Sequence, residues 1–178
     1  PRYRLVEEVV SRTGPGSLID VGCGKGRYLH NLLRRFPKIA YTGCDLLASN
    51  LVHLPIGCQQ RRASLLQLPD EQHDCVLCIE ALEHAMNIDR ALDQLTNITR
   101  PGGTLLIIDK NKQASSNLEL AEGEQWFDEA DIKRGLETRG FTVTVRRDLS
   151  RDGESESGGV FLAWEGTRAA LPIQRAAS

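Results

Sequence analysis

Short apolar runs alternate along the chain with segments in which apolar residues recur every three or four positions. The second pattern predicts helices with one buried face, and it covers 3–12, 28–36, 87–99 and 128–139, with a weaker signal at 47–53. The apolar runs lack the alternation of half-exposed strands and predict strands buried on both faces at 18–21, 40–44, 74–79 and 104–108. Further strands are expected at 58–62, 141–146 and 159–164.

The order of these elements predicts an α/β fold in which a doubly wound, mostly parallel sheet carries helices on both faces. Only a polar loop at 150–158 separates the last two strands, so we expect an antiparallel C-terminal hairpin at one edge of the sheet. Pro101-Gly-Gly103 is predicted to be a turn, and Gly140 to end the preceding helix. One domain is expected over 1–165, with a flexible tail over 166–178.

The composition is that of a globular protein of average polarity. The chain has 178 residues, of which 40% are hydrophobic and 26% charged. Its net charge of −2 argues against a protein that coats nucleic acid. The first 62 residues carry ten basic and four acidic side chains. A solvated face is the favoured interpretation of the basic residues among them, which include Arg34, Arg35, Lys38, Arg61 and Arg62.

The sequence also bears on the compartment in which the protein works. No apolar run approaches the roughly 20 residues of a membrane helix, and the first residues lack the core of a signal peptide. Five Cys, an odd number, argue against a disulfide framework. We therefore expect a cytoplasmic protein without a membrane anchor. The start at Pro1 rather than at Met suggests that residues upstream have been removed.

Cys75 and Cys78 have the C-x-x-C spacing of redox and zinc sites. They lie within an apolar run that is predicted to be a strand, where residues three apart face opposite sides of the sheet. The sequence contains no second pair of this spacing to complete a zinc site. We therefore interpret both residues as parts of the core.

A glycine-rich segment connects the first predicted strand to the following helix. Gly22, Gly24 and Gly26 leave space for a ligand beside the backbone, and the start of the helix offers free N–H groups. The dinucleotide-binding pattern G-x-G-x-x-G would need a third glycine at the position of Arg27. The phosphate-binding pattern G-x-x-x-x-G-K-[ST] is absent from the sequence.

Four ordered motifs resemble those of the class I S-adenosylmethionine-dependent methyltransferases, in particular the UbiG-like, type 11 methyltransferases of small molecules. With Asp45 at the end of the second strand, the motifs are Asp20-Val-Gly22-Cys-Gly24-Lys-Gly26, Ala63-Ser-Leu-Leu-Gln-Leu-Pro69, His73-Asp74 to Leu82-Glu83-His84, and Arg100-Pro-Gly-Gly-Thr-Leu-Leu106. His73 stands where the family usually has Phe. The resemblance spans 18–108 and implies a Rossmann-like fold that binds S-adenosylmethionine as its cofactor.

The resemblance also implies which residues hold the cofactor. Asp45 would accept hydrogen bonds from both ribose hydroxyls, an arrangement strengthened by its charge. Ser64 stands where the family commonly has an Asp that accepts from the adenine amino group, so we expect adenine recognition to rest more on the backbone N–H of Leu65. The cofactor-binding candidates are Asp20, Gly22, Cys23, Gly24, Gly26, Asp45, Leu46, Ser64, Leu65, Ile79 and Glu80.

Glu80 and His84 are the catalytic candidates, because they follow the fourth strand at the mouth of this site. His84 would serve as general base for a hydroxyl acceptor. An architectural role is the alternative, since L-E-H recurs in the family at the start of a helix. A third interpretation places Mg²⁺ or Mn²⁺ on Glu80, Glu83 and His84, as in the related methyltransferases of RNA 3′ ends and of quinones. The RNA family uses a further His, and this chain has none after His84, so we predict no metal.

The acceptor is expected to be a small or medium metabolite that is methylated at O, N or C by in-line displacement. A methyltransferase of RNA or protein and a cofactor-binding module without activity are the alternatives. Trp126 and Phe127 fit equally well as walls of an acceptor pocket or as core. Arg4 and Arg27 are the candidates for the carboxylate of the cofactor.

Overall fold

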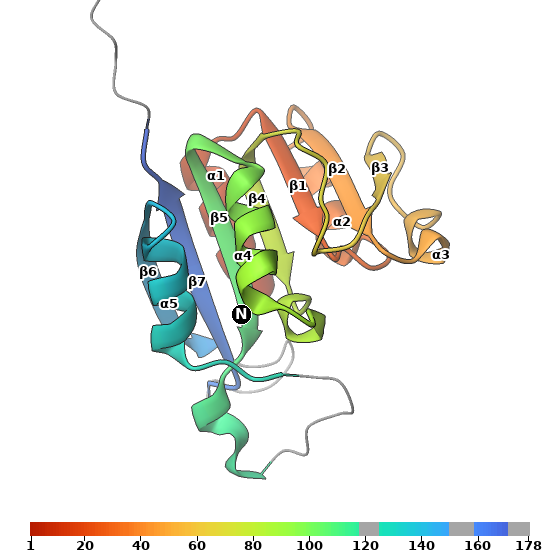
Figure 1. Cartoon of the computed structure of the whole chain (residues 1–178). Coiled ribbons are helices and arrows are strands. Elements are labelled where there is room, and N and C mark those ends of the chain that lie inside the picture. The colour runs from red at the N-terminus through yellow and green to blue at the C-terminus, as the bar shows by residue number, and fades with distance from the viewer. Residues whose placement is uncertain (118–124, 150–158, 171–178) are drawn as a thin grey trace, which may run out of the picture.

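A mixed β-sheet organises the protein (Figure 1). The computed structural model describes residues 1–117, 125–149 and 159–170. Within these residues, seven strands follow the order β3-β2-β1-β4-β5-β7-β6. The strands are β1 (Ser17–Val21), β2 (Ala40–Asp45), β3 (Gln59–Arg62), β4 (His73–Ile79), β5 (Thr99–Lys110), β6 (Phe141–Leu149) and β7 (Phe161–Arg168). The first five pair in parallel, while β7 runs antiparallel to both β5 and β6, which confirms the predicted sheet and its hairpin edge.

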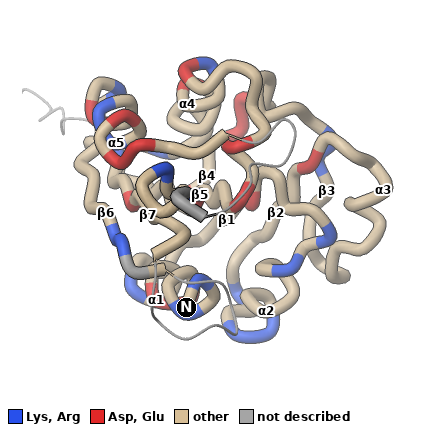
Figure 2. The backbone as a smooth tube through the Cα atoms, turned by 90° about the horizontal axis from the view of Figure 1, so that it is seen from below, with Lys and Arg blue, Asp and Glu red and all other residues tan. Residues whose placement is uncertain are grey.

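Helices cover both faces of the sheet. They are α1 (Arg2–Thr13), α2 (Arg27–Arg35), α3 (Ala48–Leu51), α4 (Ile88–Asn97) and α5 (Glu129–Glu137), with 3-10 turns η1 (Leu82–His84) and η2 (Lys112–Asn117). Figure 2 looks along the sheet from below and shows α1 and α2 on one side of the strands and α4 and α5 on the other. The described part of the chain is therefore a three-layer α/β sandwich.

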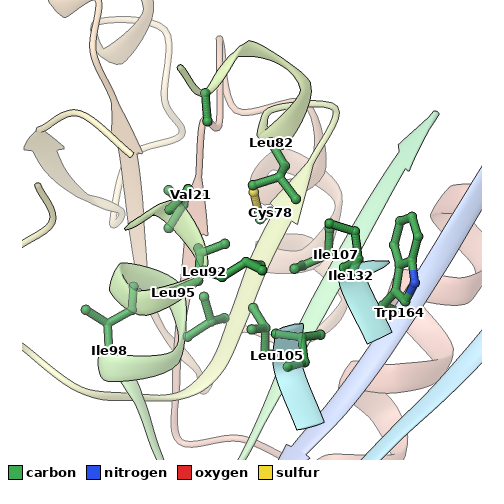
Figure 3. Packing of buried hydrophobic residues seen from close by; sticks show 14 of the residues in the cluster. Val21, Cys78, Leu82, Leu92, Leu95, Ile98, Leu105, Ile107, Ile132 and Trp164 are labelled. Carbon is green, nitrogen blue, oxygen red and sulfur yellow. The ribbon is translucent and has the colours of Figure 1, made fainter. Parts of the chain in front are cut away.

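Each central strand contributes side chains to two separate apolar clusters. Leu105 and Ile107 of β5 belong to the cluster under α4 and α5, whereas Leu106 and Ile108 belong to the cluster under α1 and α2. Figure 3 shows the first cluster, in which strand side chains meet those of α4, α5 and β7. All four β5 residues are fully buried. This burial explains why the strands show no alternation of polar and apolar positions.

The two cysteines of β4 face opposite sides of the sheet, as predicted. Cys75 lies in the α1–α2 cluster and Cys78 in the α4–α5 cluster, and both are fully buried. Burial raises the pKa of the Cys75 thiol to about 12 and places that of Cys78 well above its usual range. Both thiols therefore stay protonated and unreactive at neutral pH.

The predicted turn at Pro101-Gly-Gly103 is part of a strand. β5 begins at Thr99, and its register with β4 shifts between His73 and Cys75 to accommodate the extra residues. A Cβ at Gly103 would lie only 2.8 Å from the carbonyl oxygen of Arg100, so this irregularity requires glycine. The Pro-Gly-Gly sequence therefore indicates a β-bulge here and not a chain reversal.

The last strand extends beyond the predicted end of the domain. β7 continues to Arg168, so 166–168 belong to the sheet and not to a tail. The guanidinium of Arg168 explains the extension, because it donates to the carbonyl oxygens of Thr96, at 3.0 Å, and of Thr99. The rest of the predicted tail, 171–178, and the predicted polar loop, 150–158, lie outside the described residues.

One carboxyl group is buried within the sheet itself. Asp20 of β1 is only 2% exposed, and its Oδ2 accepts no hydrogen bond from any described residue. Burial, reinforced by the negative charge of Asp45, raises the pKa of Asp20 to about 7. The Asp20 carboxyl is therefore protonated and neutral at mildly acidic pH.

We predict that Leu106→Ala lowers the free energy of unfolding by about 3 kcal/mol, because it opens a cavity at a fully buried position. Urea denaturation measures the change. Val52→Ala, at a side chain that is 71% exposed, serves as the control and is expected to change stability by less than about 0.5 kcal/mol. Similar losses in both variants would contradict the assignment of the core.

We also predict a pH dependence of stability that originates from Asp20. The folded protein holds this proton more tightly than the unfolded chain, since its pKa is about 7 in the fold against 3.8 normally. The contribution of this proton to stability is therefore full below about pH 4. As the pH rises towards 7 the contribution is lost, and the free energy of unfolding falls by on the order of 4 kcal/mol. Asp20→Asn removes this decline. Urea midpoints of both proteins between pH 4 and pH 8 test the prediction, and parallel curves would contradict it.

Candidate functional site

The glycine loop between β1 and α2 lies at the edge of the sheet where the parallel strands end. Gly22, Gly24 and Gly26 have φ angles of +73°, +52° and +77°, which L-residues with side chains rarely adopt. A Cβ at Gly22 would also lie 2.4 Å from the Cβ of Ala81. The backbone at this position can therefore come close to a neighbour only because the side chain is absent.

The loop is tied to the end of β2. The N–H groups of Gly22 and Cys23 both donate to the carbonyl oxygen of Cys44, at 2.8 and 3.0 Å. The N–H of Gly24 donates to Oδ2 of Asp45 at 2.9 Å. These bonds hold the Asp45 carboxylate beside the loop.

Two further donors orient Asp45. The N–H of Leu47 and the side-chain amide of Asn50 donate to Oδ1, at 2.8 and 3.1 Å. A carboxylate has about four acceptor sites, so the three donors leave capacity for a ligand hydroxyl. The side chain is partly exposed, which makes that capacity accessible.

A pocket of about 330 Å³ opens at this edge, beside the ends of β1, β2 and β4. Seven of the predicted site residues line it, namely Gly22, Asp45, Leu46, Ser64, Leu65, Glu80 and His84. Its remaining walls are apolar and consist of Val21, Ala63, Leu66, Ala81, Ala85 and Met86. The other predicted residues, Asp20, Cys23, Gly24, Gly26 and Ile79, are not part of the lining, although Gly24 contacts Asp45.

Glu80 has a strained backbone and a charged partner. Its φ of +51° is the only positive value among described residues other than glycine. Its carboxylate forms an ion pair with Arg2 of α1. Arg2 is only 4% exposed, and its guanidinium lies 4.2 Å from the centre of the Phe161 ring. Glu80 thus lines the pocket, and the buried Arg2 guanidinium is its partner away from the lining.

The arginine at this position is not one of those that the sequence pointed to. Arg4 is exposed, and Arg27 lies over the ring of Tyr3, 5.0 Å from its centre. The signal that would have found Arg2 is its helical spacing, since it shares the buried face of α1 with Leu5 and Val6. A charged residue on an apolar face indicates a buried partner.

η1 holds Glu83 and His84 in very different surroundings. The Glu83 side chain is 4% exposed, and its Oε2 lies 2.9 Å from Nζ of Lys110. The His84 side chain is 59% exposed, and its Nε2 lies 3.5 Å from Oε1 of Glu83. Glu83 is thus part of the buried structure, whereas the imidazole is open to the pocket.

This arrangement does not favour a metal ion on η1. The carboxylates of Glu80 and Glu83 are each paired with a cation, Arg2 and Lys110 respectively. Among the described residues, no three His, Cys, Asp or Glu side chains gather as metal ligands would. The chemistry available at the pocket is that of an imidazole and two carboxylates, one of them paired with the buried Arg2.

Trp126 and Phe127 do not line this pocket. Phe127 is buried in the α4–α5 cluster, where it serves as core. Trp126 borders a separate cavity of about 290 Å³ between α4 and α5. Of the two interpretations that the sequence left open, Phe127 follows the second, and Glu124, just before this pair, lies outside the described residues.

Within the described chain, the helices are too short or too polar to span a lipid bilayer.

Comparison with known proteins bears on the family. The model of the Methyltransf_11 family, a methyltransferase domain, matches residues 19–107. A fatty-acid O-methyltransferase of Mycolicibacterium smegmatis is 28% identical over 142 residues, which are 76% of this chain and 50% of that protein. A ubiquinone biosynthesis O-methyltransferase of Dechloromonas aromatica is 27% identical over 135 residues, 70% of this chain and 57% of that protein. The chain thus spans about half the length of the curated relatives it matches.

A solved structure has the same fold. The methyltransferase domain of bacterial CtHen1-C superposes with a TM-score of 0.77 at 22% sequence identity, over 95% of this chain and 97% of that one. The family match begins in β1 and ends in β5, so it contains the glycine loop, Asp45 and η1. On this evidence the chain belongs to the Methyltransf_11 family of class I S-adenosylmethionine-dependent methyltransferases.

Proposed function

We propose that this protein transfers a methyl group from S-adenosylmethionine to an oxygen atom of a small or medium-sized, largely apolar metabolite. The observation that carries the proposal is the single pocket wall on which Gly22, Asp45, Glu80 and His84 meet. Gly22 allows a ligand to approach the backbone closely, and Asp45 can accept from a hydroxyl group. Glu80 belongs to an ion pair, and His84 can act as a base. The family and the names of its relatives support the same reaction class.

The residues of the pocket fit this cofactor. Asp45 retains acceptor capacity for a ribose hydroxyl, and Leu46, Ala63 and Leu65 offer apolar walls to adenine. The orphaned Oδ2 of Asp20, beneath the glycine loop, is a buried acceptor that suits a neighbouring cationic ligand. When bound, the cofactor supplies an electrophilic methyl group on a sulfonium, which leaves a neutral thioether after transfer.

The ion pair of Arg2 and Glu80 would serve the amino-acid half of the cofactor. This half carries an ammonium and a carboxylate side by side. Glu80 lines the pocket and would face the ammonium, and its buried partner Arg2 would supply the complementary charge for the carboxylate. Arg2 takes the role that the sequence assigned to Arg4 or Arg27. The cation–π contact with Phe161 holds the guanidinium in place.

The protein's own part in the chemistry is positioning and proton removal. The glycine loop and Asp45 orient the donor side, so the acceptor oxygen can approach on the line of the breaking bond. His84 lines the same pocket and takes the hydroxyl proton on a ring nitrogen as the new O–C bond forms. His84 gains the positive charge that the sulfonium loses, so the net charge of the site does not change during the transfer.

An apolar acceptor fits the rim of the pocket. Leu46 is 59% exposed and Met86 94% exposed, and both line the opening. Exposed apolar side chains beside a pocket are typical of a binding surface for apolar molecules. A polyanionic acceptor is less well served, because basic residues such as Arg35 and Arg61 are paired with Glu7 and Glu71. A cytoplasmic location completes the proposal, since all five cysteines are free thiols.

Asp45→Asn is expected to weaken cofactor binding about 10- to 100-fold, because the amide cannot provide charge-assisted acceptance for the ribose hydroxyls. Isothermal titration calorimetry with S-adenosylmethionine or S-adenosylhomocysteine measures the change. Asp70→Asn, at an exposed carboxylate outside the pocket, is the control and should bind as the wild type does. Binding that Asp45→Asn leaves unchanged would remove Asp45 from the site.

His84→Ala is expected to lower kcat for a hydroxyl acceptor by about 10²- to 10⁴-fold, the usual contribution of a general base. The dissociation constant of the cofactor should stay within twofold, because the imidazole removes a proton and does not hold the donor. A panel of phenols and alcohols, assayed by methyl transfer from labelled cofactor, supplies the acceptor. Equal losses of rate and of cofactor affinity would show an architectural role instead.

A further inference from the structure

A buried group of charges lies directly behind His84. Asp109 at the end of β5 is fully buried, and its Oδ2 accepts from the N–H of Glu83 at 3.1 Å. Its Oδ1 accepts from the N–H of Lys110 at 2.8 Å. The Glu83 carboxylate in turn contacts Lys110 on one oxygen and His84 on the other. The cluster therefore links the sheet to the exposed imidazole.

The contacts within this cluster show which charges are paired. Burial, followed by the negative charge of Glu83, raises the pKa of Asp109 well above its usual range. The Lys110 ammonium, 2.9 Å from Oε2, then neutralises Glu83. A carboxylate this deeply buried requires such a partner to remain ionised. Lys110 and Glu83 thus form one ion pair, and Oε1 of Glu83 is not part of it.

That second oxygen faces the histidine. An ionised carboxylate only accepts hydrogen bonds, so a contact with Oε1 of Glu83 requires a hydrogen on Nε2 of His84. The two atoms lie 3.5 Å apart. With the hydrogen on Nε2, the other ring nitrogen, Nδ1, has a lone pair and no hydrogen.

The surroundings of the turn show why the imidazole needs such a partner. The backbone of η1 is held on both sides, because the His84 N–H donates to Ala81 and the N–H of Gln125 donates to Glu83. The His84 side chain, in contrast, is 59% exposed. A ring in this position turns freely unless a polar group holds one of its nitrogens.

We propose that Glu83 is a positioning residue that holds His84 as the Nε2–H tautomer and directs Nδ1 towards the acceptor, with Lys110 as the counter-charge of Glu83. The inference rests on the proposed function, in which His84 removes the proton. In the transfer step, Nδ1 accepts the hydroxyl proton while the O–C bond forms and the S–C bond breaks. The imidazolium then donates through Nε2–H to Glu83, which stays unprotonated.

Nitrogen-15 NMR of the four histidine rings tests the tautomer without any acceptor, with His84→Ala providing the assignment. At a pH where the ring is neutral, the wild-type spectrum is expected to show His84 as a single Nε2–H form with an observable N–H proton. In Glu83→Gln this proton exchanges too fast to observe, and the nitrogen shifts move towards those of free imidazole. Glu137→Gln, at an exposed ion pair on α5, leaves the His84 signals unchanged.

Glu83→Asp provides a second variant in case Glu83→Gln does not fold. It retains the charge for Lys110 but withdraws the carboxylate from the ring, so the N–H signal is expected to disappear here too. For methyl transfer, both variants are expected to lower kcat at least tenfold and leave the cofactor dissociation constant within twofold. A wild-type His84 without an observable Nε2–H, or one that neither Glu83 variant affects, would overturn the proposal. An unchanged rate in His84→Ala would instead refute the proposed base and leave the tautomer result standing.

Discussion

The parallel register of β1 with its two neighbours is the constraint on which the rest of the structure depends. Val21, the last residue of β1, pairs with Cys44 on one side and with Cys78 on the other. Three strand ends are therefore brought to one level, and the connections that follow them meet there. The glycine loop, Asp45 and η1 follow directly from this alignment. A slip of one strand by a single residue would move every side chain of that strand to the other face of the sheet.

The sequence best predicted the features that require a particular residue type for a physical reason. The strands could be predicted because the runs Cys75 to Ile79 in β4 and Leu105 to Ile108 in β5 pack both faces into apolar clusters, which leaves no polar positions in these runs. The glycine loop could be predicted because Gly22 and its neighbours adopt conformations that exclude side chains. Seven of the residues named from motifs line one pocket, since the motifs lie at converging strand ends.

The sequence was less informative about pairs that only the tertiary fold brings together. Arg2 and Glu80 lie in different elements, and no local pattern connects them. The same holds for Lys110 and Glu83, whose pairing depends on how η1 packs against the end of β5. The Pro101 segment was misjudged for a related reason, because glycines that resemble a turn signal can equally accommodate a bulge. Long-range packing decided each of these cases.

The backbone of Glu80 shows how folding and binding place opposing demands on one position. A left-handed conformation costs a residue with a side chain about 1 kcal/mol or more, a cost that glycine would avoid. The conformation persists because Arg2 and the carbonyl oxygen of Ile108 hold the residue from two directions. Glycine would be the more stable choice here, but it would remove the carboxylate from the pocket wall. Position 80 therefore marks a trade-off, at which the protein gives up some stability to keep a carboxylate at the pocket.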